Sequence, residues 1–295
     1  IGYYFPSSVI KGMLAAIGII LILKQLPIAI GYSKAVAQSY HMGSIIIASI
    51  SIGIILFWDL PMLKKYVFFK YVPGALIAVL VGVALNMFFN ANMPTWALSA
   101  DALVKLPVAK NNNEFIGQFT LPNFAALGNY QVYVVAVTIA IIASIETLLS
   151  TEAADKLDPY KRVTPTNREL KAQGLGNLIS GMIGGLPMTA VIVRTSANVN
   201  AGAKTKLSAI FHGLLLLISV VAFASLLNQI PLACLAAVLL VVGYKLAKVT
   251  LFKQMYQLGW VQFVPFIVTV IAIQFSDLLK GIALGMLVAI CYILR

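Results

Sequence analysis

The chain has 295 residues, of which 61% are hydrophobic and only 10% are charged, and its mean hydropathy is +0.95. A soluble protein of this length carries charge on about a quarter of its residues, because its surface must face water. The composition therefore excludes an ordinary soluble protein and predicts an all-α polytopic membrane protein, with membrane lipid as a partner and the cell membrane as its location.

The net charge of +12 comes from 21 Lys and Arg against 9 Asp and Glu. These basic residues lie in short clusters between uncharged runs, whereas a nucleic-acid-binding protein presents a continuous basic face. Nucleic acid is therefore excluded as an expected partner. If the segment near Pro6 starts inside, fifteen of the 21 basic residues are cytoplasmic, as the positive-inside rule requires.

Apolar runs predict ten membrane segments, since a helix needs about 20 mostly apolar residues to cross the bilayer core. Their approximate limits are 7–31, 43–58, 71–90, 130–152, 168–185, 188–198, 205–228, 231–245, 258–276 and 278–294. The shortest of them cannot cross as straight helices, which predicts broken or half-spanning helices whose backbone is buried in protein. The long loop at 91–129 is expected to be an exposed extracellular or periplasmic connector.

A short sequence echo favours an inverted repeat. Residues 57–60 and 275–278 each follow one apolar run and precede another, and residues 5–8 have a counterpart at 230–233. Seven predicted segments separate each pair, and an odd number places the two copies on opposite membrane faces, as in secondary transporters.

Glu146 is the first residue for which the sequence predicts a function. It lies more than two turns inside an apolar run, where a carboxylate costs a few kcal/mol or more unless it is paired or faces water. Ser150 follows four residues later, on the same helical face, so the pair could hold Na⁺ or the carboxylate could carry a proton. The alternatives are a structural ion pair with Arg194, or a helix that ends soon enough to leave Glu146 near the interface.

The second predicted site follows the two glycines and the proline of residues 184–187, which stop one helix and start another in mid-membrane. The backbone amides of Thr189, Ala190 and Val191 would then lack helical acceptors and form an anion site. Arg194 would add a permanent positive charge.

Each of these features has a structural alternative. Glycines 181 and 185 could form a helix-packing face, with Arg194 extending toward the cytoplasm. Lys24 is expected to extend outward from its span, and His212, with no second metal ligand at a suitable spacing, is expected to be a packed polar residue. No nucleophile, base and orienting acid occur together, so enzymatic chemistry has little support.

These residues resemble the sulfate permease (SulP) anion transporters, which are related to the animal SLC26 proteins. The similarity extends through essentially the whole chain and resembles bacterial inorganic anion transporters most. It is specific at residues 144–147, 167–177, 184–187, 194–195 and 201–205, and at residues 4–12.

The resemblance implies a UraA-like fold of fourteen segments in two inverted repeats of seven, divided into a core domain and a gate domain. The ten segments would then be the fifth to the fourteenth, so the chain is expected to lack the first four segments and the STAS domain. Residues 1–90 and 229–295 would be gate, 91–129 the connector, and 130–228 the second half of the core.

The resemblance also implies roles for individual residues. Glu146 matches the position of the coupling carboxylate, with Ser150 beside it, and the Glu favours H⁺ over Na⁺. The anion would bind at Thr189, Ala190, Val191, Ile192, Val193 and Arg194, although Val193 replaces a Ser found in some animal members.

The implied activity is secondary active transport of sulfate or bicarbonate by an elevator mechanism. No cofactor beyond a coupling ion is expected, and the full-length protein is expected to form a homodimer. The alternatives are an anion-sensing, motor-like or channel-like module without coupled transport, and an intramembrane enzyme.

Overall fold

The computed structural model describes residues 6–32, 40–66, 68–69, 72–108, 112–191, 194–195, 198–199, 202–276 and 278–293. Within these ranges the fold is all-α, as predicted, with one isolated β-bridge between Leu103 and Pro231. Five helical stretches are long and apolar enough to cross a membrane: Ser7–Ala29, Gly74–Asn92, Tyr130–Glu152, Leu207–Leu227 and Leu232–Gln257. Three shorter apolar helices accompany them. The chain is thus a multi-pass membrane protein.

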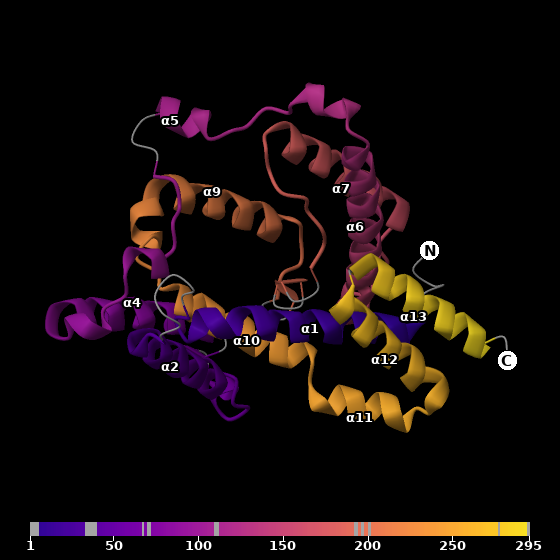
Figure 1. Cartoon of the computed structure of the whole chain (residues 1–295), viewed down its shortest axis with the longest axis horizontal. Coiled ribbons are helices and arrows are strands. Elements are labelled where there is room, and N and C mark those ends of the chain that lie inside the picture. The colour runs from indigo at the N-terminus through magenta and orange to yellow at the C-terminus, as the bar shows by residue number, and fades with distance from the viewer. Residues whose placement is uncertain are drawn as a thin grey trace. The chain divides into compact units, whose positions relative to one another are not determined.

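Most predicted segments coincide with helices to within a few residues (Figure 1). The helices are α1 (Ser7–Ala29), α2 (Met42–Trp58), α4 (Gly74–Asn92), α5 (Asn112–Gly117), α6 (Tyr130–Leu157), α7 (Thr166–Met182), α9 (Leu207–Leu227), α10 (Leu232–Leu246), α11 (Val249–Gln257), α12 (Trp260–Phe275) and α13 (Leu278–Ile293). Short 3-10 turns lie at Leu63–Lys65, Pro94–Trp96, Ala100–Ala102 and Phe124–Gly128.

The chain divides into two compact units. Unit 1 consists of residues 1–10 and 109–215, and unit 2 of residues 11–108 and 216–295. Helix α9 belongs to both, and its backbone leaves helical geometry at Phe223 (φ −122°, ψ 18°).

Unit 2 is held together by small residues that let helices approach closely. Helix α2 packs against α4 and α10, and α12 packs against α13. A Cβ added to Gly82 of α4 would lie 2.0 Å from the sulfur of Cys234 on α10, and one added to Gly18 of α1 would lie 2.6 Å from the carbonyl oxygen of Gly243. Such contacts leave no space for a side chain, so close backbone approach is part of this packing.

The first part of the loop at 91–129 is hydrogen-bonded to the rest of unit 2. Leu98 is buried and donates its amide to the side chain of Asn86, 3.1 Å away. The amide of Leu106 donates to Asn228 Oδ1 at 2.6 Å, and Asn228 Nδ2 donates back to the Leu106 carbonyl at 3.0 Å. Most described residues of the connector are exposed, and its first part is held in place because polar side chains of unit 2 bind its backbone.

Helix α11 lies where the sequence predicts a loop. Its nine residues are too few to span a bilayer and include Lys253, so a search for apolar runs passes over it. Its apolar side chains recur at helical spacing, however, and Met255 among them is fully buried.

Candidate functional site

Glu146 lies in the middle of a long helix of unit 1. Helix α6 continues to Leu157, so the alternative in which the helix ends just after Glu146 is wrong. Glu146 is partly buried, and Thr147 and Ser150, which follow it on the same helix, are buried. Among the described residues, its carboxylate has no hydrogen bond or ion pair, and Arg194 is exposed and does not reach it. The ion pair considered from the sequence is therefore absent from the described part of the chain.

The break after α7 differs from its prediction. Residues 185–191 are not helical, and helical geometry is found at residues 194, 195, 198 and 199. The amide of Thr195 donates to the carbonyl of Val191 at 3.1 Å, a helical hydrogen bond. The predicted helix start at residue 188 is thus wrong, since residues 188–191 are not helical and the first described helical residue after them is Arg194.

Side chains of α7 hold this extended segment, residues 185–191, by binding its backbone. Asn177 accepts from the amide of Met188 at 2.6 Å and donates to its carbonyl at 3.0 Å, which Gln173 Nε2 also binds at 3.0 Å. Ser180 Oγ donates to the carbonyl of Leu186 at 2.9 Å. These contacts explain the late helix start, because backbone groups satisfied by side chains do not need helical partners.

The positions of Gln173, Asn177 and Ser180 carry a signal that the search for charged residues missed. Their spacing of four and then three residues places them on one face of α7. Polar side chains that are partly buried cost free energy unless they find a hydrogen-bond partner. A polar stripe of this kind therefore indicates a neighbouring backbone that lacks its own hydrogen bonds.

Thr147 connects the extended segment to α6. Its Oγ1 accepts from the amide of Ala190 at 3.2 Å, and it directly follows Glu146 in the sequence. One of the three amides predicted to face an anion is thus occupied by a side chain. Thr189 and Ala190 precede the helix, Val191 supplies a helical acceptor, and Ile192 and Val193 lie outside the described residues.

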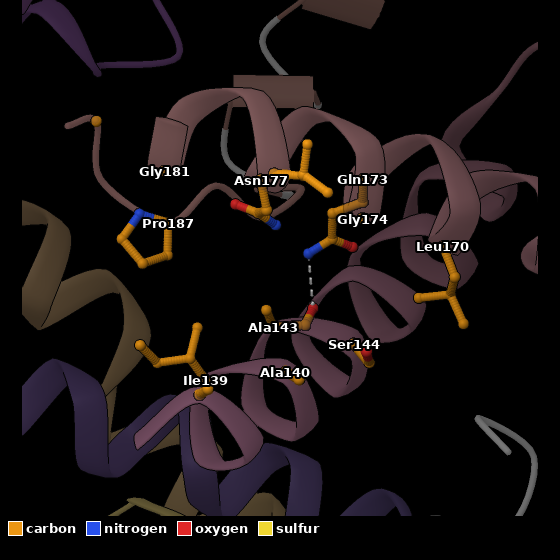
Figure 2. A pocket seen from close by; sticks show the side chains of 13 residues that line it. Ile139, Ala140, Ala143, Ser144, Leu170, Gln173, Gly174, Asn177, Gly181 and Pro187 are labelled. Atoms are coloured by element: carbon orange, nitrogen blue, oxygen red, sulfur yellow. Dashed lines mark hydrogen bonds between the residues drawn. The ribbon is translucent and has the colours of Figure 1, made fainter. Parts of the chain in front are cut away.

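A cavity of about 540 Å³ lies in unit 1 beside this arrangement. Helix α6, helix α7 and the first extended residues line it: Ala136, Ile139, Ala140, Ala143, Ser144, Leu170, Gln173, Gly174, Asn177, Leu178, Gly181, Gly185 and Pro187. Figure 2 shows Gln173 donating across it to the Ala143 carbonyl, at 3.3 Å. The cavity is largely apolar, and none of the predicted site residues line it. The carboxylate of Glu146 and the guanidinium of Arg194 are therefore better candidates than the cavity for binding ions.

The end of α6 away from the cavity carries an ion pair. Arg162 binds both carboxylate oxygens of Asp158, at 2.8 and 2.9 Å, and donates to the carbonyl of Lys204 at 3.0 Å. Hydrogen bonds from the side chain and then the backbone of Arg162 hold the pKa of Asp158 well below its usual 3.8. This contact ties the loop after α6 to the loop before α9.

Two further predictions concern single residues. Lys24 is exposed on α1, in agreement with a side chain that extends outward. His212 is exposed on α9, so the expectation of a packed histidine is wrong in the described structure, where α9 offers few intramolecular contacts.

A sequence model of the sulfate permease family matches residues 1–269. The chain belongs to the sulfate permease family. It is 26% identical to YvdB of Bacillus subtilis (strain 168), over 99% of the chain and 55% of YvdB. It is 24% identical to the bicarbonate transporter BicA of Synechocystis sp., over 96% of the chain and 49% of BicA. The chain thus spans about half the length of the curated relatives it matches.

Solved structures show the same fold. The transmembrane domain of a cyanobacterial bicarbonate transporter BicA superposes with a TM-score of 0.68 at 23% identity, covering 98% of this chain and 70% of that domain. The structure of SLC26A9 gives a TM-score of 0.79 at 16% identity, over 98% of this chain and 46% of that one. The fold is therefore that of the SLC26 and BicA transmembrane domains.

Proposed function

We propose that the protein containing this chain is a secondary active transporter of an inorganic anion, either sulfate or bicarbonate. Family membership supports transport, and the relatives include BicA, named for bicarbonate, and a bovine sodium-independent sulfate anion transporter that is 28% identical over 130 residues. These names describe transporters, which makes an intramembrane enzyme the weaker alternative.

The observation that carries the proposal is the extended segment 185–191 and the helical residues that follow it. Side chains of α6 and α7 satisfy its backbone and hold the start of the following helix beside Glu146 on α6. A helix N-terminus carries partial positive charge, and transporters place such ends at their substrate sites. The anion in this proposal lies where residues 189–194 lead into the helix, with Arg194 supplying positive charge.

Glu146 is the proposed coupling group, with Ser150 one turn away. A partly buried carboxylate with no protein partner among the described residues can take up a proton as the site fills, and can hold Na⁺ together with a hydroxyl. The Glu favours H⁺ in this proposal, and Na⁺ is the second choice.

The proposed motion is an elevator movement of core against gate. The two compact units support it, since residues 109–215 overlap the predicted core and residues 11–108 and 216–295 overlap the predicted gate. A homodimer of the full-length protein is part of the same proposal, and light scattering of the purified protein tests it.

Uptake measurements test the proposed function. The full-length protein in proteoliposomes is expected to accumulate radiolabelled sulfate or bicarbonate when a pH or Na⁺ gradient is imposed, and to stop when an ionophore removes that gradient. Flux that is independent of the pH and Na⁺ gradients would favour a channel-like module. Voltage-dependent capacitance without flux would favour a motor-like one.

Arg194→Ala tests the anion site separately. Loss of a charged group that binds the anion is expected to weaken binding by about tenfold or more, measured by calorimetry with the anion that wild type transports. Arg168→Ala, which removes an exposed arginine of α7, is the matched control and is expected to bind like wild type. Equal affinity in both variants would remove Arg194 from the site.

A further inference from the structure

One side of helix α11 of unit 2 packs against the protein core. Met255 is fully buried and packs with Phe266 of α12, and Leu251 and Phe252 pack against the same cluster. Figure 1 shows α11 between the end of α10 and the start of α12. Helices α10 and α12 are apolar, whereas α11 follows a lysine, contains Lys253 and has most of its apolar residues on one side, as expected of a helix that lies at the membrane surface.

The opposite side of α11, together with the residues at its two ends, carries apolar and basic side chains that do not pack into the core. We call it the α11 stripe; it consists of Lys248, Val249, Lys253, Tyr256, Leu258 and Trp260. More than half of each of its four apolar residues is exposed. Neither lysine has an ion-pair partner among the described residues.

Ring contacts hold the aromatic part of the stripe in place. The ring of Tyr256 lies 5.9 Å from that of Trp260 and 5.3 Å from that of Phe263, with edge-on geometry in both cases. Phe263 in turn stacks on the buried Phe266 at 6.4 Å. The exposed Tyr and Trp are therefore anchored to the core and presented outward as a preformed surface.

The chain that follows α2 in unit 2 also exposes basic and aromatic side chains. An ion pair between Lys245 and Asp59 brings the end of α10 to the end of α2. The chain that follows α2 exposes Lys65, Tyr66 and Phe68. The basic residues of this segment and of the α11 stripe lie on the side that the sequence predicts to be cytoplasmic.

We propose that the α11 stripe binds the headgroups of anionic phospholipids. Tyr and Trp are the residues that favour the boundary between headgroups and acyl chains, and lysine attracts an anionic headgroup while its aliphatic stem lies along apolar surface. An acidic protein segment would complement the two lysines, but it would cover the exposed rings of Tyr256 and Trp260 with polar groups. Anionic lipid matches both parts of the stripe. The stripe fixes unit 2 to the headgroup layer.

The test uses fluorescence of Trp260 in the complete chain reconstituted into vesicles. Trp58→Phe and Trp96→Phe leave Trp260 as the only tryptophan of the three in the chain. Brominated phosphatidylglycerol, added as a minor component to phosphatidylcholine vesicles, is expected to quench Trp260 more strongly than brominated phosphatidylcholine at the same fraction. Each lysine near an anionic surface contributes about fivefold in affinity, so Lys248→Gln with Lys253→Gln should lower the preference by tenfold or more.

The matched control is Lys24→Gln with Lys105→Gln, which removes the same charge from residues outside the stripe and should leave the preference intact. Equal quenching by the two brominated lipids would overturn the proposal, and so would no quenching by either, which is the result expected if a protein covers the stripe. Should the Trp→Phe background fail to fold, native mass spectrometry of the otherwise unchanged chain takes its place. Phosphatidylglycerol retained by wild type and lost with the two lysines supports the proposal, and equal retention contradicts it.

Discussion

The two units of this chain are stabilised by different interactions. Unit 2 is a bundle in which helices α2, α4 and α10 meet through small residues, and its buried clusters contain side chains such as Ile47, Cys234 and Phe266. In unit 1, helix α7 has no buried residue among those described, and an extended segment is held by polar side chains instead. Close packing resists deformation, whereas individual hydrogen bonds to a backbone can be exchanged. The comparison therefore predicts that unit 2 resists deformation and that the extended segment of unit 1 opens more easily.

A large loss of stability is expected from Gly18→Ala in unit 2. The added methyl would lie 2.6 Å from the Gly243 carbonyl oxygen and 2.9 Å from the Ala247 nitrogen, and backbone atoms cannot rotate away. Overpacking of this kind lowers the free energy of unfolding by about 1–3 kcal/mol. Thermal unfolding in detergent measures it.

Gly53→Ala is the control in the same unit. Apart from its chain neighbours and its own helix backbone, no atom lies within 4 Å of the added methyl, and alanine in a helix interior is worth up to about 1 kcal/mol over glycine. Gly53→Ala should therefore unfold at or above the wild-type temperature. If the two variants unfold together, close packing does not stabilise unit 2.

A smaller and local effect is expected from Asn177→Ala in unit 1. The change removes two hydrogen bonds to Met188, which Gln173 replaces only in part, so local opening of residues 185–191 should become easier by about 1 kcal/mol. Hydrogen exchange of peptides from this segment should rise several-fold while peptides from α12 stay unchanged. Asn92→Ala, which loses a bond to its own helix at Phe88, is the control and should leave segment 185–191 protected.

The smallest effect is expected at the Arg162 contact and is best seen through pH. Because the folded pKa of Asp158 is depressed, the ion pair contributes fully above pH 3.8 and is lost only as pH falls through the lowered value. Hydrogen exchange at residues 202–206, corrected for intrinsic rates, should be equally slow at pH 7 and pH 5. Arg162→Gln should raise it at both pH values, and a loss of protection in wild type already at pH 5 would contradict the contact.

The sequence predicted the membrane helices well because each is defined by its own apolar residues. Helices α2 and α10 begin and end within one residue of their predicted limits, and the burial of residues around Glu146 agrees with a carboxylate inside the membrane domain. These are local properties: length, hydropathy and the position of a charge in a run.

Features that depend on distant partners were missed or misplaced. The helix after Pro187 begins late because Asn177 and Thr147, on two other helices, bind the backbone that precedes it. Helix α11 was missed because its stability comes from packing Met255 against α12 rather than from its own length. Neither partner is visible in the local sequence that each feature occupies.

The measurement that tests the central claim most directly is gradient-driven uptake by Glu146→Gln in the full-length protein. Glutamine keeps the shape of the side chain and cannot exchange a proton or pair with a cation, so it should abolish accumulation of the transported anion in proteoliposomes under an imposed gradient, while Glu152→Gln, one and a half turns further along α6, retains it. Accumulation by Glu146→Gln at the wild-type rate would contradict the proposal that this carboxylate couples transport.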